Sequence, residues 1–364
     1  MRFHPYLRLD IAGTLDIKPV AMELNNRSVW VASTVTISLS LPPFEIEVKL
    51  FQDSNLITLS PEPFSTRVRQ STILAAYEKL ADWFGIRGFK VRFANPEFFG
   101  CGLGASGAAL TGVAYLINKT GRGITIETGQ LPCIASAVEN EANLGLTGLQ
   151  DQCAALASGV NLWNWWYEPL KTYTRHRVPI DLVELEKRLV LAITRTKHNS
   201  TELNRLQLKR FSMEDFKTIN LLAYQFFMAC ENGDFSRMME LIDKEHSLRK
   251  ERVPERMTEQ LKKLESIAQK VGCAFAVAGA GGGGACWALA ETEAQAVRLY
   301  EEWANEPLEL LMFPNVAKID WFRESTGQSE KKKRSPKQPG QPAKELPLEG
   351  KDVPSLTEQK ATAE

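Results

Sequence analysis

Two long runs without a charged residue, both dense in glycine, constrain this 364-residue chain most strongly. They cover 98–118 and 271–290, and each is about as long as a membrane-spanning helix. The first contains five glycines and the second contains six. Because each glycine inside a helix costs about 1 kcal/mol relative to alanine, a spanning helix is disfavoured. Both runs are better explained as buried strand–loop–helix or strand–loop–strand segments whose backbone approaches another group closely.

The first run contains the segment FFGCGLGASGAAL at 98–110. A strand that leads into closely spaced glycines and then a helix of small residues aims backbone N–H groups at one spot, at the positive end of the helix. A polyphosphate fits such a site. The segment lacks the Gly-Lys-Ser/Thr of a Walker A loop, and it lies too far along the chain for the usual dinucleotide fingerprint. A tight turn with close helix packing is the alternative interpretation.

The second run contains VAGAGGGGACWALA at 277–290, with four consecutive glycines at 281–284. Glycine loses more conformational freedom on folding than any other residue, so packing alone does not account for four in a row. A flexible linker is the alternative, but linkers are polar, and this segment is flanked by apolar residues. The pattern therefore predicts that another group lies against this backbone.

In ENEANLGLTGLQDQ at 139–152, two acidic residues precede a glycine turn, and an isolated Asp151 follows it. Mg²⁺ prefers one or two carboxylates together with substrate phosphates, and a kinase also places a carboxylate near the attacking hydroxyl. Glu139 and Asp151 are candidates for these tasks. Taken alone, an aspartate in the position of Asp151 is more often a helix N-cap.

The composition excludes several classes of function. Lys+Arg and Asp+Glu both total 44, so the net charge gives no reason to expect a nucleic acid or an acidic membrane as partner. The six cysteines form no C-x-x-C pair, which argues against a zinc site and a disulfide framework. The first residues lack the apolar stretch of a signal peptide, so we expect a cytoplasmic protein.

Periodicity predicts a mixture of strands and helices. Residues 28–51 alternate between apolar and polar positions, which predicts antiparallel strands joined by a turn at Pro42 and Pro43. Further strands are expected at 88–96, 157–166 and 188–196, and helices at 68–84, 126–143, 213–249 with a break at 231–235, 255–271 and 291–305. Residues 325–364 lack aromatic residues and contain KKKR beside a proline-rich stretch, which predicts a disordered tail.

The glycine runs and the acidic segment, read together in this order, resemble the galactokinase, homoserine kinase, mevalonate kinase and phosphomevalonate kinase (GHMP kinase) superfamily. The segments that carry the resemblance are RLDIAGTLD at 8–16, GCGLGASGAA at 100–109 and GAGGGG at 279–284. Among members the chain looks most like the bacterial D-glycero-D-manno-heptose 7-phosphate kinases and fucokinase-like sugar kinases. The resemblance implies a two-domain α+β fold: a ribosomal protein S5 domain 2-like N-terminal domain at 1–180 and a ferredoxin-like C-terminal domain at 181–324.

The resemblance also assigns roles by position. It implies a phosphate loop made by Gly100, Gly102, Gly104, Ala105, Ser106 and Gly107, and metal ligands at Ser106 and Glu139. It also implies that Asp151 is the catalytic aspartate with Arg8 as its basic neighbour, and that the acceptor contacts Asp16, Gly281 and Gly282. The sequence departs from the family pattern in three places: Ala105 stands where a first serine is usual, Phe98 replaces a proline, and the first motif is shorter.

The resemblance implies ATP-dependent, Mg²⁺-assisted phosphoryl transfer to a hydroxyl of a small-molecule acceptor, a sugar or sugar phosphate. It leaves open whether the protein forms a homodimer. Two alternatives stay open at this point. One is a kinase for a non-sugar hydroxyl, and the other is a catalytically silent regulator that binds ATP and sugar.

Overall fold

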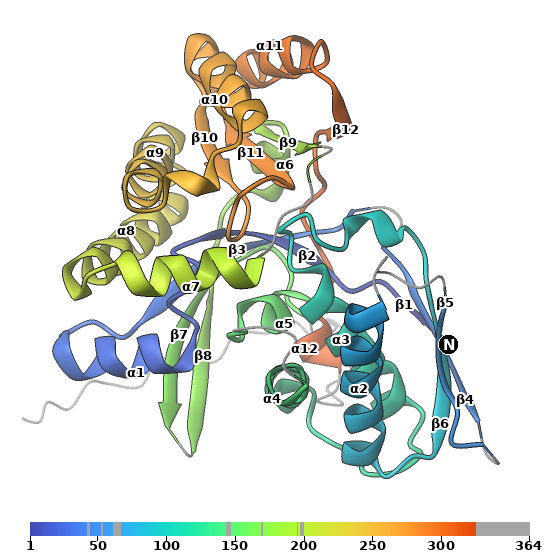
Figure 1. Ribbon diagram of the computed structural model, residues 1–364. Coiled ribbons are helices and arrows are strands. Elements are labelled where there is room, and N and C mark those ends of the chain that lie inside the picture. The colour runs from blue at the N-terminus through green and yellow to red at the C-terminus, as the bar shows by residue number, and fades with distance from the viewer. Residues whose placement is uncertain are drawn as a thin grey trace, which may run out of the picture. The chain divides into compact units, whose positions relative to one another are not determined.

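The computed structural model describes residues 1–41, 44–51, 54–60, 67–142, 147–168, 170–194, 196 and 200–324 (Figure 1). Residues 1–326 form one compact unit. The predicted disordered tail at 325–364 lies outside the described residues. The proposed domain boundary between residues 180 and 181 stays a prediction.

The strands described by the structure form three sheets. The first has the order β1 (Arg2–Phe3), β4 (Ile46–Phe51), β6 (Gly88–Phe93), β5 (Ile57–Ser60), and only the β5–β6 pair is parallel. The second is antiparallel, with the order β2 (Leu7–Ile11), β3 (Ser33–Leu39), β7 (Val160–Glu168), β8 (Lys171–Arg177). The third, also antiparallel, has the order β10 (Ala274–Val277), β11 (Ala285–Leu289), β9 (Leu189–Thr194), β12 (Leu308–Met312).

The alternating segment 28–51 does contain strands, but its strands do not pair with each other. β3 pairs with β2 and β7, whereas β4 pairs with β1 and β6 in a different sheet. The expectation of neighbouring antiparallel strands across a turn is therefore wrong, and Pro42 and Pro43 lie outside the described residues. Alternation predicts an extended segment with one buried face, but the choice of partner strand depends on the rest of the sheet.

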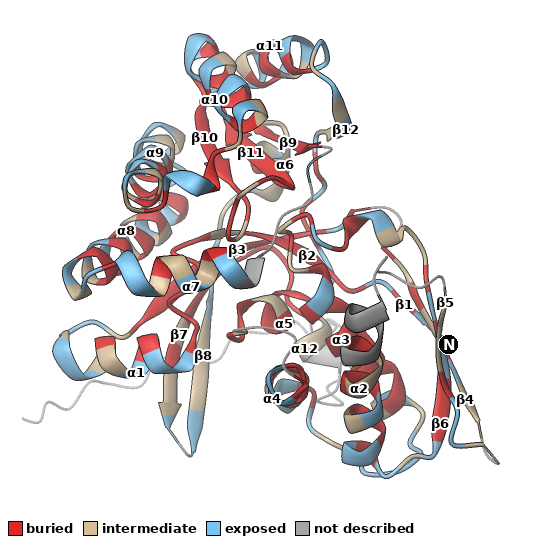
Figure 2. Cartoon of the chain, viewed as in Figure 1, coloured by how far each residue is buried: buried red, intermediate tan, exposed pale blue. Residues whose placement is uncertain are grey.

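Helices α2 (Arg67–Phe84), α3 (Ala105–Lys119) and α4 (Leu131–Glu141) pack on one another, and α3 also packs on the first sheet. Figure 2 shows α3 buried along most of its length. A Cβ atom on Gly112 would lie 2.8 Å from Ile46 Cδ1, so glycine at this position permits the close approach of α3 to β4. The helix expected over 126–143 begins later, at Leu131, after a short 3₁₀ turn η2 (Thr128–Gln130).

The predicted break at 231–235 is confirmed: α8 (Met213–Glu231) ends there, and α9 (Phe235–Arg252) begins. Gly233 has φ +64°, and the side chain of Asp234 caps α9 by accepting from Arg237 N at 2.9 Å. The helix expected from 255 starts only at α10 (Glu259–Val271). Pro254–Arg256 instead forms a 3₁₀ turn, η3, and Thr258 caps α10. Both α8 and α9 carry a buried stripe and an exposed stripe (Figure 2).

The other described elements are α1 (Lys18–Arg27), η1 (Pro96–Phe98), α5 (Gln150–Ala154), α6 (Leu182–Glu186), α7 (Ser200–Arg210), α11 (Glu293–Trp303) and α12 (Trp321–Glu324). The first uncharged run forms a glycine loop and α3, but the strand before it, β6, ends at Phe93, and the 3₁₀ turn η1 lies between the two. The second run forms the expected hairpin, β10–β11. Of the helices that the structure describes, none is long and apolar enough to cross a bilayer.

Candidate active site

The first glycine loop, residues 100–104, leads directly into α3 and shapes its N-terminus. Gly100, Gly102 and Gly104 have φ of 79°, 86° and 76°, and Gly104 is the N-cap residue without a side-chain cap. The first N–H groups of a helix have no partner within the helix, so those that open α3 are free to bind an acceptor-rich group. Ser106 is exposed at this end, and Ala105 is buried. Such a helix end can bind phosphate, and the assignment of this loop to ATP stays a prediction.

The second glycine loop, residues 279–284, lies against the first. Ala285 N donates to Cys101 O at 2.6 Å. A Cβ atom on Gly279 would lie 2.8 Å from Gly102 O, and one on Gly284 would lie 2.5 Å from Cys101 O. The close neighbour expected from the sequence is therefore the backbone of the first glycine loop. The alternative of a flexible linker is wrong, since the segment is the turn of a β-hairpin.

Asp151 lies near the start of α5, but it does not cap that helix. The N-cap position is Leu149, and the Asp151 carboxylate accepts from Arg8 Nε at 2.7 Å through Oδ1. Arg8 Nη1 donates to Asp10 Oδ1 at 2.7 Å and to Gly102 O at 2.9 Å. Burial works to lower the pKa of Arg8, but the carboxylates of Asp10 and Asp151 raise it above its ordinary value. Arg8 is therefore a fixed cation that joins Asp151 to the first glycine loop.

Glycine in the loop allows Asp151 to reach the start of α3. A Cβ atom on Gly104 would lie 2.9 Å from Asp151 Cγ, and one on Gly107 would lie 2.9 Å from Asp151 Cβ. The Asp151 side chain keeps 25% of its surface exposed, so it remains accessible to a ligand. The predicted catalytic aspartate and the predicted phosphate loop are thus in direct contact.

Glu139 lies on α4 and faces the same helix end. Its Oε1 accepts from Ser106 Oγ at 3.0 Å, and its Oε2 accepts from Gln152 Nε2 at 2.7 Å. Burial, with a further contribution from the Asp151 charge, raises the pKa of Glu139 to about 7, against the opposing hydrogen bonds from Ser106 and Gln152. A cation bound beside this buried carboxylate would stabilise its ionised form and lower its pKa.

The donor set at this point fits Mg²⁺. Among the described residues no three His, Cys, Asp or Glu side chains gather into a metal cluster. Mg²⁺ in kinases is commonly held by only one or two carboxylates, with phosphate oxygens and water as its other ligands. Glu139 and Ser106 offer oxygen atoms beside the first glycine loop, and they would hold the ion there.

Asp16 is buried and binds the backbone at the start of α5. Its Oδ2 accepts from Leu149 N at 2.8 Å and from Gln150 N at 3.0 Å, and Tyr167 Oη donates to its backbone carbonyl. Burial raises the pKa of Asp16 to about 6, although the hydrogen bond from Gln150 opposes this shift. Asp16 therefore positions the chain that leads into Asp151, and contact between Asp16 and sugar hydroxyls stays a prediction.

The turn after β2 holds unfavourable backbone conformations near the site. Ala12 has φ 61° and Thr14 has φ 83°, and each such non-glycine residue costs about 1–3 kcal/mol. Two side chains of α9 hold the turn in place: Glu245 Oε1 accepts from Ala12 N at 3.1 Å, and Arg249 Nη2 donates to Gly13 O at 2.6 Å. Strain of this kind persists only where the surrounding contacts enforce it.

Sequence reasoning missed Asp10, Gln152, Glu245 and Arg249. Asp10 had a signal, because residues two apart on a strand share a face, and Arg8 and Asp10 do so on β2. Gln152 follows Asp151 closely, but nothing in the sequence connects it with Glu139. Glu245 and Arg249 are one turn apart on a helix, and only folding brings them to the turn after β2.

Gly281 and Gly282 contact η3. A Cβ atom on Gly281 would lie 2.9 Å from Arg256 Cβ, and Gly282 N donates to Arg256 O at 2.7 Å. The Gly282 amide is therefore engaged by the protein itself. The assignment of both glycines to the acceptor site stays a prediction.

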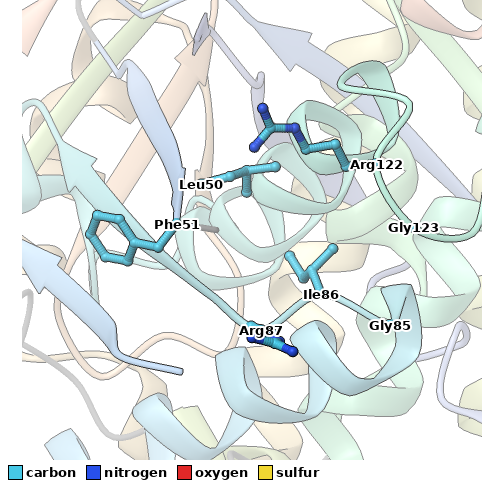
Figure 3. Close-up of a pocket in the computed structure, with 7 residues that line it drawn as sticks. All are labelled: Leu50, Phe51, Gly85, Ile86, Arg87, Arg122 and Gly123. Atoms are coloured by element: carbon cyan, nitrogen blue, oxygen red, sulfur yellow. The ribbon is translucent and has the colours of Figure 1, made fainter. Parts of the chain in front are cut away.

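A separate surface pocket of about 240 Å³ lies at the other end of α3 (Figure 3). Its described lining comes from β4, from the connection between α2 and β6 and from the turn after α3: Leu50, Phe51, Gly85, Ile86, Arg87, Arg122 and Gly123. With 15 residues, α3 is about 20 Å long, so this pocket is remote from the first glycine loop. None of these lining residues is a predicted site residue.

Comparison with known families gives two matches. The model of the GHMP kinases N terminal domain matches residues 71–159, and the model of the GHMP kinases C terminal region matches residues 226–309. The first match contains the first glycine loop, Glu139 and Asp151, and the second contains the second glycine loop. No curated protein matches the sequence significantly.

Solved structures share the fold at low sequence identity. A mevalonate kinase is 17% identical, with a TM-score of 0.63 over 88% of this chain and 100% of that chain. Streptococcus pneumoniae phosphomevalonate kinase in complex with phosphomevalonate and AMPPNP is 16% identical, with a TM-score of 0.66 over 85% and 98%. A D-glycero-D-manno-heptose 1-phosphate kinase from Bacteriodes thetaiotaomicron is 16% identical, with a TM-score of 0.61 over 87% and 96%. These likenesses confirm the two-domain α+β fold.

Proposed function

The chain belongs to the GHMP kinase superfamily, and from this we propose that it transfers a phosphoryl group from ATP to a hydroxyl of a sugar or sugar phosphate. One observation carries the proposal: Asp151, fixed by Arg8, touches the glycine loop at the free N-terminus of α3, while Ser106 and Glu139 meet at the same helix end. A base, a phosphate cradle and oxygen donors for a metal therefore adjoin one another.

Phosphoryl transfer needs positioning and charge stabilisation more than covalent chemistry by the protein. The N–H groups at the start of α3 face the triphosphate, and the helix end favours its negative charge. Bound at Ser106 and Glu139, Mg²⁺ supplies neutralisation of the phosphate charge. These groups hold the phosphoryl donor in place.

Asp151 acts on the acceptor. Because Oδ1 is engaged by Arg8 Nε, the other carboxylate oxygen is left to accept the hydrogen bond and then the proton of the attacking hydroxyl. Arg8 fixes the direction of the carboxylate and also binds Gly102 O, so the base and the loop keep one relative position. The buried cation also stabilises negative charge that develops at this point.

The test is ADP release by the purified protein with ATP, Mg²⁺ and a panel of free and phosphorylated sugars, extended to amino alcohols and isoprenoid alcohols. We expect acceptor-dependent ADP release with at least one sugar or sugar phosphate, and its loss in Asp151→Asn. Turnover with a non-sugar alcohol alone would contradict the proposed acceptor class. Binding of ATP without ADP release for any acceptor would favour the regulator instead of the kinase.

A further inference from the structure

Arg256 is a buried arginine that forms no ion pair within the described part of the chain. It retains 3% of its surface, and its Nε and Nη1 have no hydrogen-bond partner among the described residues. Its Nη2 makes one long contact, 3.5 Å from Val277 O. Burial and the nearby charge of Arg249 lower the pKa of Arg256 to about 9, although Glu245 and Asp10 oppose the shift. A buried cation with two unused donors is costly unless an anion joins it.

Arg256 lies beside the second glycine loop, whose Gly281 and Gly282 are predicted to contact the acceptor. η3 carries Arg256 against the second glycine loop, where Gly282 N donates to its carbonyl. The charge on Asp10, the partner of Arg8, also acts on Arg256.

The neighbouring arginine is fully paired, which sets Arg256 apart. Arg249 Nε donates to Glu245 Oε1 at 2.6 Å, and Arg249 Nη1 donates to Gln207 Oε1 at 2.8 Å. Gln207 is also buried, and its Nε2 lacks an acceptor in the part of the chain that the structure describes. Gln207, which contacts Arg249, and Arg256, whose pKa the charge of Arg249 lowers, therefore both have buried donors without acceptors among the described residues. The missing partner is a group rich in acceptor oxygens.

We infer that Arg256, assisted by Gln207, binds a phosphate monoester carried by the acceptor, so that the acceptor is a phosphorylated sugar. The inference rests on the proposed function, because it assigns the subsite to the substrate of that reaction. A phosphate matches the fork of a guanidinium and offers more than one oxygen to its donors. The γ-phosphate of ATP is the other source of the same chemistry, and the experiment separates the two.

Both unpaired nitrogens of Arg256 are out of contact with solvent, so the ligand reaches them only when a neighbouring segment moves. The segment beside Arg256 is the second glycine loop, in which Gly281, Gly282 and Gly283 have φ of 86°, 78° and 119°. Glycine backbone carries no side-chain barrier to such a change. Binding of the phosphorylated acceptor should therefore change amide hydrogen exchange within 278–285.

The kinetic experiment compares the wild type, Arg256→Gln, Arg256→Lys and the exposed control Arg298→Gln. Acceptors are hexose and heptose phosphates and the same sugars without phosphate. For the phosphorylated acceptor we expect Arg256→Gln to lower kcat/KM by about 100-fold or more, and Arg256→Lys to recover part of it. The KM for ATP should stay within about twofold, and the control should match the wild type. A matching rise in the KM for ATP would assign the phosphate to the nucleotide and overturn the inference.

A binding experiment separates failure of the subsite from failure of the proposed function. Calorimetry and hydrogen exchange are run with the phosphorylated sugars on the wild type and on Arg256→Gln. Binding to the wild type that is lost in the variant supports the subsite, even if no acceptor is phosphorylated. If the wild type binds only unphosphorylated sugars, or if the variant binds phosphorylated sugars equally well, the inference is wrong. A large fall in Tm for Arg256→Gln without ligand would assign Arg256 a structural role.

Discussion

Arg8 Nε lies 2.7 Å from Asp151 Oδ1, although 143 positions separate the two residues in the chain. The same guanidinium binds Asp10 and the carbonyl of Gly102. One buried cation on β2 therefore fixes the candidate base on α5 and the first glycine loop together. The proposed chemistry depends on this contact of Arg8 with Asp151, Asp10 and Gly102 more than on any single motif.

We expect Asp151→Asn to keep the fold and ATP binding but to lower turnover by about 100-fold or more, since an amide cannot take up the proton of the acceptor. Steady-state kinetics on the true acceptor, with ATP binding measured by calorimetry, checks this. Asp82→Asn, on the exposed side of α2, is the matched control and should behave as the wild type. Near-normal turnover of Asp151→Asn would remove Asp151 from the role of base.

Arg8→Gln should destabilise the protein by about 3 kcal/mol, because it removes the buried cation that the partly buried carboxylates of Asp10 and Asp151 share. Arg210→Gln is the comparison: it breaks an exposed pair with Glu255, and we expect a much smaller loss of stability, because solvent screens exposed pairs. Urea unfolding of both variants measures the difference. Equal losses would show that these contacts of Arg8 do not stabilise the fold.

Glu139 should make Mg²⁺ binding depend on pH. Burial raises its pKa from 4.5 to about 7, so the folded protein holds a proton on Glu139 at pH values where the unfolded chain has lost it. The contribution of Glu139 to unfolding free energy therefore falls as pH rises from about 4.5 to about 7. Because Mg²⁺ must displace that proton, we expect the thermal shift caused by Mg²⁺ and ATP to be larger at pH 8 than at pH 6.

The variant Glu139→Gln should weaken that pH dependence and raise the Mg²⁺ concentration needed for half-maximal rate, since an amide binds a hard cation less well. Glu141→Gln, at the exposed end of the same helix, is the control. ATP itself titrates in this range, and its contribution is shared by both variants. An unchanged Mg²⁺ titration together with a large loss of Tm would make Glu139 a structural residue.

Gly104→Ala and Gly100→Ala separate backbone strain from contact with Asp151. Both glycines have positive φ, so each substitution should cost about 1–2 kcal/mol in stability. Only at Gly104 would the new Cβ meet Asp151 Cγ, at 2.9 Å, whereas at Gly100 no atom lies within 4 Å. We therefore expect a further loss of turnover in Gly104→Ala alone, measured by steady-state kinetics. Equal turnover in the two variants would contradict the close contact.

Local sequence predicted the elements whose signals are themselves local. The glycines of 98–110 predicted a loop before a helix, and the structure has that loop before α3. The segment at 231–235 predicted a helix break, and Gly233 and Asp234 provide it. The strand pattern at 28–51 predicted extended chain correctly but mispaired its strands, because alternation specifies a face and leaves the neighbour undefined.

The sequence by itself determined the fold class, the family and the residue types available for phosphate and metal binding, since these depend on periodicity, glycine spacing and motif order. Only the tertiary structure decided which groups meet: Arg8 with Asp151, Glu139 with Ser106 and Gln152, and the second glycine loop with the first. It also buried the Nε and Nη1 atoms of Arg256 without an acceptor among the described residues. Burial and pairing at long sequence separation arise from the packing of whole sheets and helices, and no local pattern encodes them.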